Sequence, residues 1–291
     1  DWRYSPRPGV VLGEQFHPLD IVGCYIPGGT APLVSTVCHT VAIARTAGVK
    51  DIVVCTPPGG AKGIHPALLY ACRAAGATAI YRLGGVYAIA AMAIGTATIP
   101  KVEKICGPGN AYVAAAKRRL YGEVALDLVA GPSEVLVIAD DTANPVYLAA
   151  DILSQAEHGS GREQAVLVST DRRILDEAAR EIVRQAASLK RQECVQKVLE
   201  NGLFLVEAAD LEDAARIASL YAPEHLELQV ADPKALAPKI TAAGAIFMGE
   251  YTPEPVGDYI AGPSHVLPTG GTARFFNGLT GDAFFRRTSL L

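Results

Sequence analysis

The chain has 291 residues and 50% of them are hydrophobic, which is enough to bury the cores of about two ordinary globular domains. Its formal net charge of -4 offers no general attraction to nucleic acid or to an anionic membrane surface. No apolar run is long and uninterrupted enough to cross a bilayer. These totals favour chemistry on a small-molecule substrate, with neither nucleic acid nor a membrane as partner.

The six cysteines are scattered through apolar stretches and never form a CxxC pair. This spacing suits neither a zinc ribbon nor a dense disulfide framework. No segment combines a charged start, an apolar centre and a small-residue cleavage site. We therefore expect free thiols in a reducing compartment, and a cytoplasmic location.

From Asp20 onward, short β-branched runs alternate with longer alanine-rich stretches, as expected for parallel strands joined by helical crossovers. In the first set we predict strands over 21–25, 51–55, 78–83 and 104–106, and helices over 32–47, 65–75, 87–94 and 111–121. In the second set we predict strands over 134–139, 164–169, 203–206, 225–229 and 245–248, and helices over 145–157, 171–189, 192–200, 211–221 and 233–242. The stretch from Tyr251 onward is rich in Gly and Pro and is expected to form a site-building loop and a tail.

These two alternating sets predict an α/β fold with two Rossmann-like domains, whose mostly parallel sheets face a shared cleft. We place the first domain at residues 26–131 and the second at 132–270. Residues 1–25 would complete the second domain, and residues 271–291 would form a C-terminal tail.

Gln155 and His158 stand three residues apart at the end of a predicted helix, so a helix would put them on one face. An amide oxygen and an imidazole nitrogen there could share a cation with a carboxylate such as Asp258. The alternative is ordinary capping, because a histidine in the last helical turn also stabilises the helix dipole.

Glu224 and His225 begin a predicted strand. Histidine has the basicity to take a proton from a hydroxyl near neutral pH, and a neighbouring glutamate could activate water. A surface Glu-His pair at a strand start is the alternative. Asp258 and His265 lie in the Gly/Pro-rich stretch, where a functional role is favoured over a core role.

Three glycine-containing turns follow predicted strands, at 28–30, 84–85 and 107–110. Such turns present backbone N–H groups at the carboxyl edge of a parallel sheet and are natural contacts for phosphate or ribose. Glycine is equally needed for tight turns, and none of the three spells GxGxxG.

Several ordered strings resemble the histidinol dehydrogenase family, and the likeness runs from roughly Asp20 to Arg286. They are Gly23-Cys24-Tyr25-Ile26-Pro27-Gly28-Gly29, Gly107-Pro108-Gly109-Asn110, Gly131-Pro132-Ser133-Glu134-Val135, Ser154 to His158, Ala222-Pro223-Glu224-His225-Leu226 and His265-Val266-Leu267-Pro268-Thr269. The resemblance implies a zinc- and NAD-dependent enzyme of histidine biosynthesis. It would oxidise an amino alcohol through an aldehyde to a carboxylate, most directly L-histidinol to L-histidine, and consume two NAD molecules.

The resemblance also implies roles for individual residues. Gln155, His158 and Asp258 would be zinc ligands and would also contact the substrate. His225 would be the general base and a substrate contact, and Glu224 would help to activate water.

Ser133 and His265 would be further substrate contacts in the same family pattern. Tyr25 and Asn110 would contact NAD, together with Tyr87, which stands where family members usually carry a glutamine. Family members form homodimers, so a homodimer is a further expectation. Two alternatives stay open, namely a dehydrogenase of another small hydroxylated substrate and a nucleotide- or ligand-binding homologue with little or no turnover.

Overall fold

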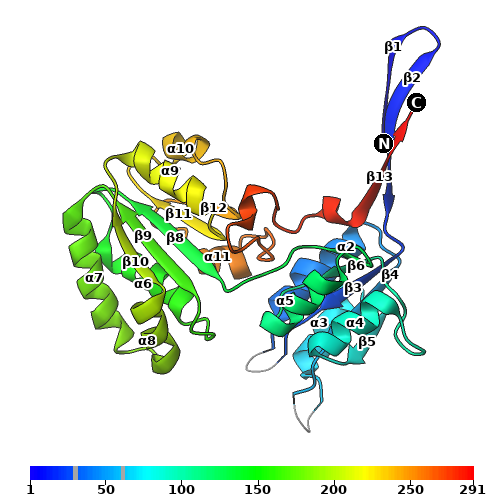
Figure 1. Ribbon diagram of the computed structural model, residues 1–291, viewed down its shortest axis with the longest axis horizontal. Coiled ribbons are helices and arrows are strands. Elements are labelled where there is room, and N and C mark those ends of the chain that lie inside the picture. Colours follow the sequence, from blue (N-terminus) through cyan, green and yellow to red (C-terminus); the bar gives the residue numbers. More distant parts are fainter. Residues whose placement is uncertain (29–31, 60–62) are drawn as a thin grey trace. The chain divides into compact units, whose positions relative to one another are not determined.

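The computed structural model describes residues 1–28, 32–59 and 63–291 (Figure 1). They divide into two compact units, unit 1 with Asp1–Val129 and Leu279–Leu291, and unit 2 with Ala130–Gly278. Each unit holds a parallel five-stranded sheet accompanied by helices, which confirms the predicted α/β fold class. No helix in the described ranges is both long and apolar enough to cross a membrane.

The large sheet of unit 1 has the order β5-β4-β3-β6-β7. Its strands are β3 (Ile21–Tyr25), β4 (Asp51–Thr56), β5 (Ala79–Arg82), β6 (Lys104–Cys106) and β7 (Ala125–Leu126). Its helices are α1 (Val34–Val37), the π-helical turn η1 (Cys38–Ala42), α2 (Ile43–Thr46), α3 (Pro66–Ala75), α4 (Gly85–Ile94) and α5 (Ala111–Leu120). Tyr25, Val53 and Cys55 form one core cluster with apolar residues of α4 and α5.

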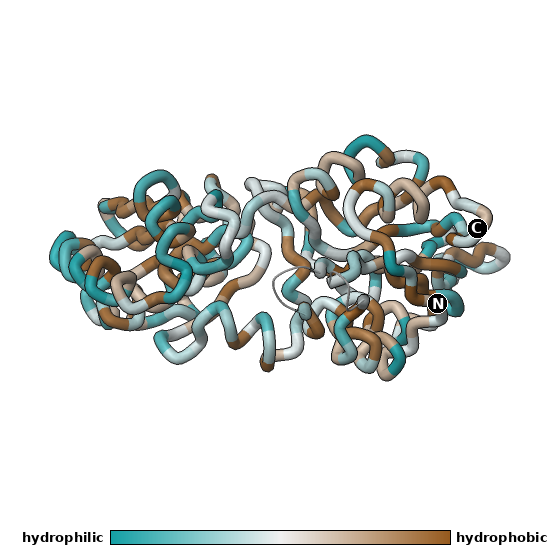
Figure 2. The backbone as a smooth tube through the Cα atoms, turned by 90° about the horizontal axis from the view of Figure 1, so that it is seen from below, coloured by the Kyte–Doolittle hydropathy of each residue, from teal (hydrophilic) through white to brown (hydrophobic). Residues whose placement is uncertain are grey.

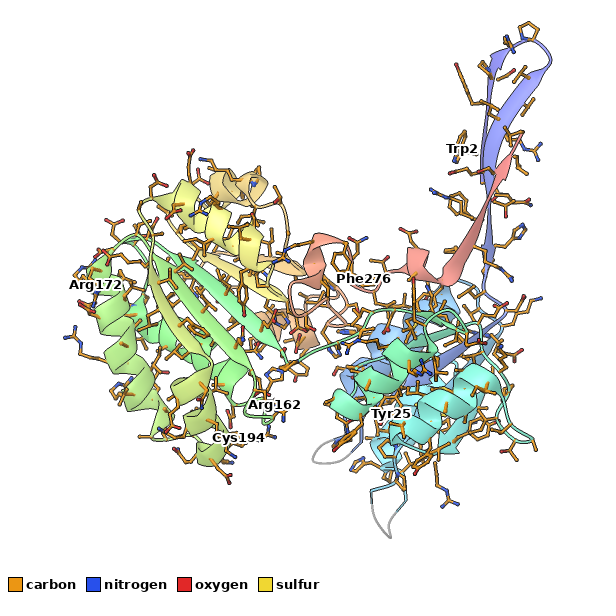
Figure 3. The ribbon with its side chains drawn as sticks, in the orientation of Figure 1. Trp2, Tyr25, Arg162, Arg172, Cys194 and Phe276 are labelled. Carbon is orange, nitrogen blue, oxygen red and sulfur yellow. The ribbon has the colours of Figure 1, made fainter. Side chains whose placement is uncertain are left out.

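Residues 1–25 do not complete the second domain, contrary to our expectation. β3 is the central strand of the unit 1 sheet, because it pairs with both β4 and β6. β1 (Trp2–Arg7) and β2 (Val10–Pro18) form a hairpin, and β13 (Phe285–Leu290) pairs with β2 to complete an antiparallel ribbon. The labelled Trp2 lies on this ribbon (Figure 3). The end of the predicted tail therefore belongs to unit 1, while residues up to Gly278 belong to unit 2.

The sheet of unit 2 has the order β10-β9-β8-β11-β12, which repeats the topology of the unit 1 sheet. Its strands are β8 (Glu134–Ala139), β9 (Gln164–Ser169), β10 (Leu203–Glu207), β11 (His225–Gln229) and β12 (Ala245–Met248). Its α-helices are α6 (Pro145–Ala156), α7 (Arg172–Ala186), α8 (Gln192–Asn201), α9 (Leu211–Tyr221), α10 (Pro233–Leu236) and α11 (Glu254–Tyr259). Short 3-10 turns are η3 (Ala237–Lys239) and η4 (Thr272–Arg274) in unit 2, and η5 (Gly281–Phe284) in unit 1.

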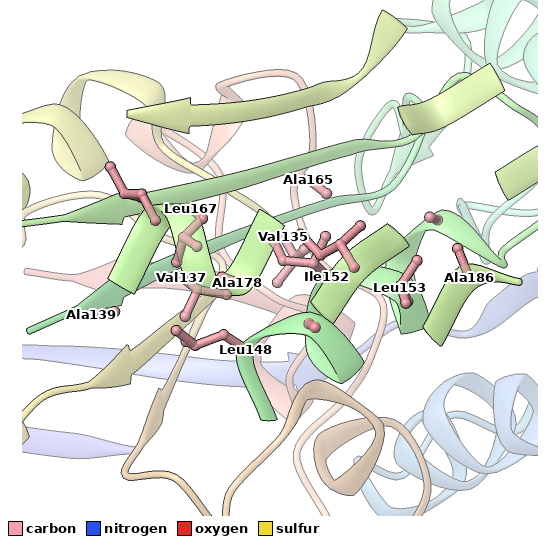
Figure 4. Packing of buried hydrophobic residues seen from close by; sticks show 14 of the residues in the cluster. Val135, Val137, Ala139, Leu148, Ile152, Leu153, Ala165, Leu167, Ala178 and Ala186 are labelled. Atoms are coloured by element: carbon pink, nitrogen blue, oxygen red, sulfur yellow. The ribbon is translucent and has the colours of Figure 1, made fainter. Parts of the chain in front are cut away.

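The two faces of the unit 2 sheet carry separate cores, because side chains alternate between the faces of a strand. Val135 and Val137 of β8 pack with residues of α6, α7 and α8 (Figure 4). Leu136 and Ile138 pack with residues of α9 and α10 on the opposite face. Along the helices in Figure 2 the colour of the tube changes repeatedly between hydrophobic and hydrophilic, as expected when one face of a helix is buried.

The stretch after Tyr251 is not all loop, because α11 lies within it. Pro253 is the N-cap of α11 and Pro255 lies in its first turn, where the missing proline N–H has no helical partner to lose. The prolines and glycines of this stretch predict a loop, and this prediction is wrong for residues 254–259. The helix matters because it carries Asp258.

Candidate active site

Strand β11 carries a row of polar side chains on one face. His225, Glu227 and Gln229 alternate with two leucines, and all of them are buried. The register pairs His225 with Val135 and Glu227 with Val137. Because those valines pack against α6, the polar row lies on the α6 face of the sheet.

The C-terminal end of α6 brings Gln155 and His158 together. The helix ends at Ala156, so His158 lies in the following turn, with its Nδ1 3.4 Å from Nε2 of Gln155. The guanidinium of Arg191 donates to the carbonyl oxygens of Glu157 and His158 at 2.9 and 3.1 Å. A cation at this position also complements the negative end of the α6 dipole. Arg191, at the start of α8, thus fixes the turn that carries His158 through these hydrogen bonds.

Helix α11 presents Glu254 and Asp258, which stand four residues apart and share one face. Together with His158 they form a group whose potential ligand atoms all lie within 4.8 Å of one another. Ser154 of α6 donates its hydroxyl to Oε2 of Glu254 at 3.1 Å. The structure therefore brings the predicted His158 and Asp258 together and adds Glu254. Sequence analysis missed Glu254, because its four-residue spacing from Asp258 points to a shared face only when these residues are known to be helical.

His225 faces this group with its Nε2 atom. Nε2 lies 3.9 Å from Oδ1 of Asp258 and 4.0 Å from Oε1 of Glu254, and it has no hydrogen-bond partner among the described residues. Nδ1 lies 3.0 Å from the carbonyl oxygen of Glu134, which can only accept a hydrogen bond. Nδ1 therefore carries the proton, and in the neutral ring the lone pair is on Nε2, where a proton can be taken up.

Glu224 lies beside His225 and is held by two donors. Its Oε2 accepts the hydroxyl of Ser133 and, at 3.1 Å, the backbone N–H of Glu134. Burial raises the pKa of Glu224 to about 7, although these two hydrogen bonds oppose the shift. A carboxyl with such a pKa exchanges protons readily near neutral pH.

The donor set fits a divalent cation. Oε1 of Gln155 is buried and has no hydrogen-bond partner within the described parts of the chain, as expected for an atom that serves as a ligand. An amide oxygen, an imidazole nitrogen and carboxylate oxygens are ligands that zinc accepts. Gln155, His158 and Asp258 together could hold such an ion, with Glu254 in the same group.

This group lies at the amino edge of the unit 2 sheet, because His225 is the first residue of β11. In open α/β sheets, ligands usually bind outside the carboxyl ends of the strands. Helix α6 follows β8 and runs back along the sheet, so its last turn returns Gln155 and His158 to the amino edge. The site is consequently built where helices end and strands begin.

In unit 1 the predicted turns lie at the carboxyl ends of strands. The hydroxyl of Tyr25 accepts the N–H of Gly85 at 3.1 Å, and the buried ring packs under α4. Oδ1 of Asn110 accepts two backbone N–H groups at the start of α5. Tyr87 is 74% exposed on α4. The side-chain oxygens of Tyr25 and Asn110 therefore accept hydrogen bonds from backbone N–H groups of these turns. Contacts of Tyr25, Tyr87 and Asn110 with NAD stay predictions.

Close packing explains why glycine stands in two of these turns. A Cβ at Gly107, whose φ is +111°, would lie 2.1 Å from the carbonyl oxygen of Tyr25. A Cβ at Gly84 would lie 2.5 Å from Cβ of Pro57. In the first predicted turn, Gly29 and Thr30 lie outside the described residues.

His265 is half-buried in the loop that follows α11. This loop is tied to the turn that carries Ser133, because Thr269 accepts the N–H of Gly131 and Oε1 of Glu134 accepts the N–H of Gly270 at 3.0 Å. The ties place the loop beside the start of β8. The role of His265 as a substrate contact stays a prediction.

Because of three buried carboxyl groups, we expect the free energy of unfolding of the metal-free chain to depend on pH in an unusual way. Burial is the main reason why the pKa values of Glu134, Glu224 and Asp258 are raised to about 7. A carboxyl with a higher pKa when folded binds more protons in the folded than in the unfolded state, so the free energy of unfolding falls as pH rises from about 4.5 to about 7. Calorimetry should show a melting temperature lower by about 10 °C or more at about pH 7.5 than at about pH 5.

The Glu224→Gln variant tests the cause, since glutamine resembles the protonated acid. It should raise the melting temperature near pH 7.5 and leave it unchanged near pH 5. Glu200→Gln, at an exposed position on α8, is the control and should change neither value. An equal pH dependence in the parent and Glu224→Gln would contradict the assignment of this effect to Glu224.

Comparisons with known proteins give the family of the chain. A family model described as histidinol dehydrogenase matches residues 1–291. Histidinol dehydrogenase of Heliobacterium mobile is 49% identical over 290 residues, covering 100% of this chain and 68% of that protein. The Geobacter sulfurreducens protein of the same name is 47% identical over 291 residues, covering 100% of this chain and 67% of that protein. The chain thus spans about two thirds of the length of these relatives.

Solved structures give the same answer for the fold. The crystal structure of histidinol dehydrogenase from Elizabethkingia anophelis matches with a TM-score of 0.95 and 43% identity, covering 99% of this chain and 66% of that chain. An acetylating aldehyde dehydrogenase from Geobacillus thermoglucosidasius matches with a TM-score of 0.64 and 17% identity, covering 96% of this chain and 76% of that chain, and shows a shared fold alone. The family and the class of enzyme predicted from the motifs are confirmed: the chain belongs to the histidinol dehydrogenase family.

Proposed function

We propose that the chain catalyses the zinc- and NAD-dependent oxidation of L-histidinol, through the aldehyde, to L-histidine. The observation that carries the proposal is the arrangement around Nε2 of His225, which has no hydrogen-bond partner among the described residues and faces carboxylates of the potential metal group at 3.9–4.0 Å. The family name supplies the substrate. Zinc and NAD are part of the proposal, because the sequence motifs resemble those of a zinc- and NAD-dependent family.

Gln155, His158 and Asp258 would hold the zinc ion, which when bound supplies Lewis acidity at the substrate hydroxyl. Nε2 of His225 takes the hydroxyl proton, while Nδ1 stays bonded to the carbonyl of Glu134 and keeps the ring in place. The carbon that bears this hydroxyl would then transfer a hydride to one NAD⁺. The products of this step are the aldehyde and NADH.

The second oxidation requires water. Glu224, with its pKa raised to about 7, accepts a proton as water adds to the aldehyde. Ser133 donates to Glu224 and so fixes the direction of its carboxyl. A second hydride transfer to a second NAD⁺ yields the carboxylate. The reaction uses two NAD⁺ and one water for each alcohol.

The turns at the carboxyl ends of the unit 1 strands support NAD binding there, since this edge is where parallel sheets usually bind nucleotides. Tyr25, Tyr87 and Asn110 are the proposed contacts. All six cysteines are free, which suits a cytoplasmic protein. A homodimer is part of the same proposal.

The experiment is direct: the purified chain, loaded with zinc, is incubated with L-histidinol and NAD⁺, and NADH absorbance is followed. We expect NADH to form only when all three components are present. A panel of other amino alcohols and small hydroxylated compounds tests the substrate. A flat trace with saturating L-histidinol would contradict the proposal.

A second candidate is a homologue that binds metal and nucleotide with little turnover. It predicts thermal stabilisation by zinc and by NAD⁺ without NADH formation.

A further inference from the structure

We propose that Glu227 is a positioning residue that sets Glu254 and Asp258 in the site by holding the start of α11. The inference rests on the proposed function for its metal site and deepens it. Glu227 is 1% exposed in the middle of β11, and its Oε1 accepts the backbone N–H of Glu254 at 2.8 Å. Its own carboxyl is outside the group of potential metal ligands found among the described residues.

A glutamate is an unusual choice for this place. The strand is buried on both faces, and a carboxyl there costs free energy unless it is hydrogen-bonded. An apolar side chain would serve the core equally well. Its two oxygens accept hydrogen bonds from the N–H of Glu254 on α11 and from Gln229, which offsets the cost of burying the carboxyl.

Helix α11 depends on this acceptor. Its N-cap, Pro253, makes no side-chain hydrogen bond to the first turn. Pro255 has no N–H, and the N–H of Val256 bonds to the carbonyl of Pro253. The N–H of Glu254 thus has no acceptor within the first turn of α11. It donates to Oε1 of Glu227 on β11 instead.

This hydrogen bond ties the start of α11 to β11, and both carboxylates of the site lie on that one short helix. Glu254 then points to Ser154, and Asp258 follows one turn later, with Oδ1 3.9 Å from Nε2 of His225. A rotation of α11 would move both carboxylates together.

The same cluster reaches the other elements of the site. Nε2 of Gln229 donates to Oε2 of Glu227 at 3.1 Å and to Oδ2 of Asp151 at 2.6 Å. Asp151 lies one turn before Gln155 on α6. Glu227, Gln229 and Asp151 therefore connect β11, α6 and α11, the elements that carry the proposed base and the proposed ligands.

The experiment compares three variants of the full chain by Co²⁺ titration, followed through the visible absorbance of the bound ion, and by thermal unfolding. Glu227→Leu keeps the volume and removes the acceptor. Glu227→Gln keeps an oxygen in the same place. Leu228→Ala is the matched control. It removes packing from the same strand on the opposite face of the sheet, where Leu228 lies in one core cluster with residues of α9 and α10.

Glu227→Leu should lower the Co²⁺ affinity by about 10-fold or more and change the spectrum of the bound ion, as expected when the support of a metal ligand is lost. Glu227→Gln should restore affinity to within about 3-fold of the parent. Leu228→Ala should lower the melting temperature without changing affinity. Parent-like affinity in Glu227→Leu, or an equal loss in Leu228→Ala, would overturn the inference.

Amide hydrogen exchange separates this inference from the proposed function, because it needs no metal. Glu227→Leu should speed exchange over residues 254–260 selectively, whereas Leu228→Ala should not. If the parent binds no Co²⁺ but this selective change is seen, the metal site fails and the positioning role stands. Unchanged exchange over 254–260 would refute the positioning role itself.

Discussion

Replacing His225 with alanine should lower kcat for L-histidinol oxidation by about 10²- to 10⁴-fold, the range typical of losing a positioned general base. The physical reason is that Nε2 is the lone-pair nitrogen that faces the site, while Nδ1 is committed to the carbonyl of Glu134. The rate of NADH formation under saturating substrate measures the effect.

Two controls make this result specific. His225→Ala should still bind Co²⁺, because the imidazole is outside the group of potential ligands formed by His158, Glu254 and Asp258. His17→Ala, on the ribbon of unit 1, should keep the parent rate. A His225→Ala variant with parent-like turnover would exclude His225 as the base.

Replacing His158 with alanine should weaken Zn²⁺ and Co²⁺ binding by about 100-fold or more, because it removes the one imidazole of the potential ligand group. NADH formation should fall in parallel and recover in part at high metal concentration. Competition with a chelator of known affinity measures the loss.

Glu157→Ala is the matched control for this change, since Glu157 is the neighbouring residue but its carboxyl lies outside the ligand group. Its metal affinity should match that of the parent. Equal affinities for His158→Ala and the parent would move the metal site away from the end of α6.

The two sheets share one strand order but use opposite edges. In unit 1 the candidate cofactor turns follow the strands, whereas in unit 2 the proposed catalytic residues precede them. The two units therefore share a fold, but their proposed functional residues lie at different edges of the sheet. The amino edge of unit 2 is suited to a metal because the end of α6 delivers side chains there, and because the polar row of β11 starts at His225.

The sequence by itself determined the alternating strands and helices, because their periodic apolar patterns are local. Strands such as Ile21–Tyr25 and Glu134–Ala139 match their predicted bounds. The ribbon was not predicted, since β13 pairs with β2 across most of the chain and no local pattern encodes such a pairing. Helix α11 was also missed, because Pro and Gly within it obscured the helical pattern.

The candidate site divides in the same way. Residue types and family motifs indicated Gln155, His158, His225 and Asp258 from the sequence alone. Only the tertiary structure decided that Nε2 of His225 faces the carboxylates, because that orientation depends on the hydrogen bond of Nδ1 to a carbonyl on the neighbouring strand. The roles of Glu254 and Glu227 follow from contacts between β11 and α11, which sequence spacing cannot show because these residues lie on different elements.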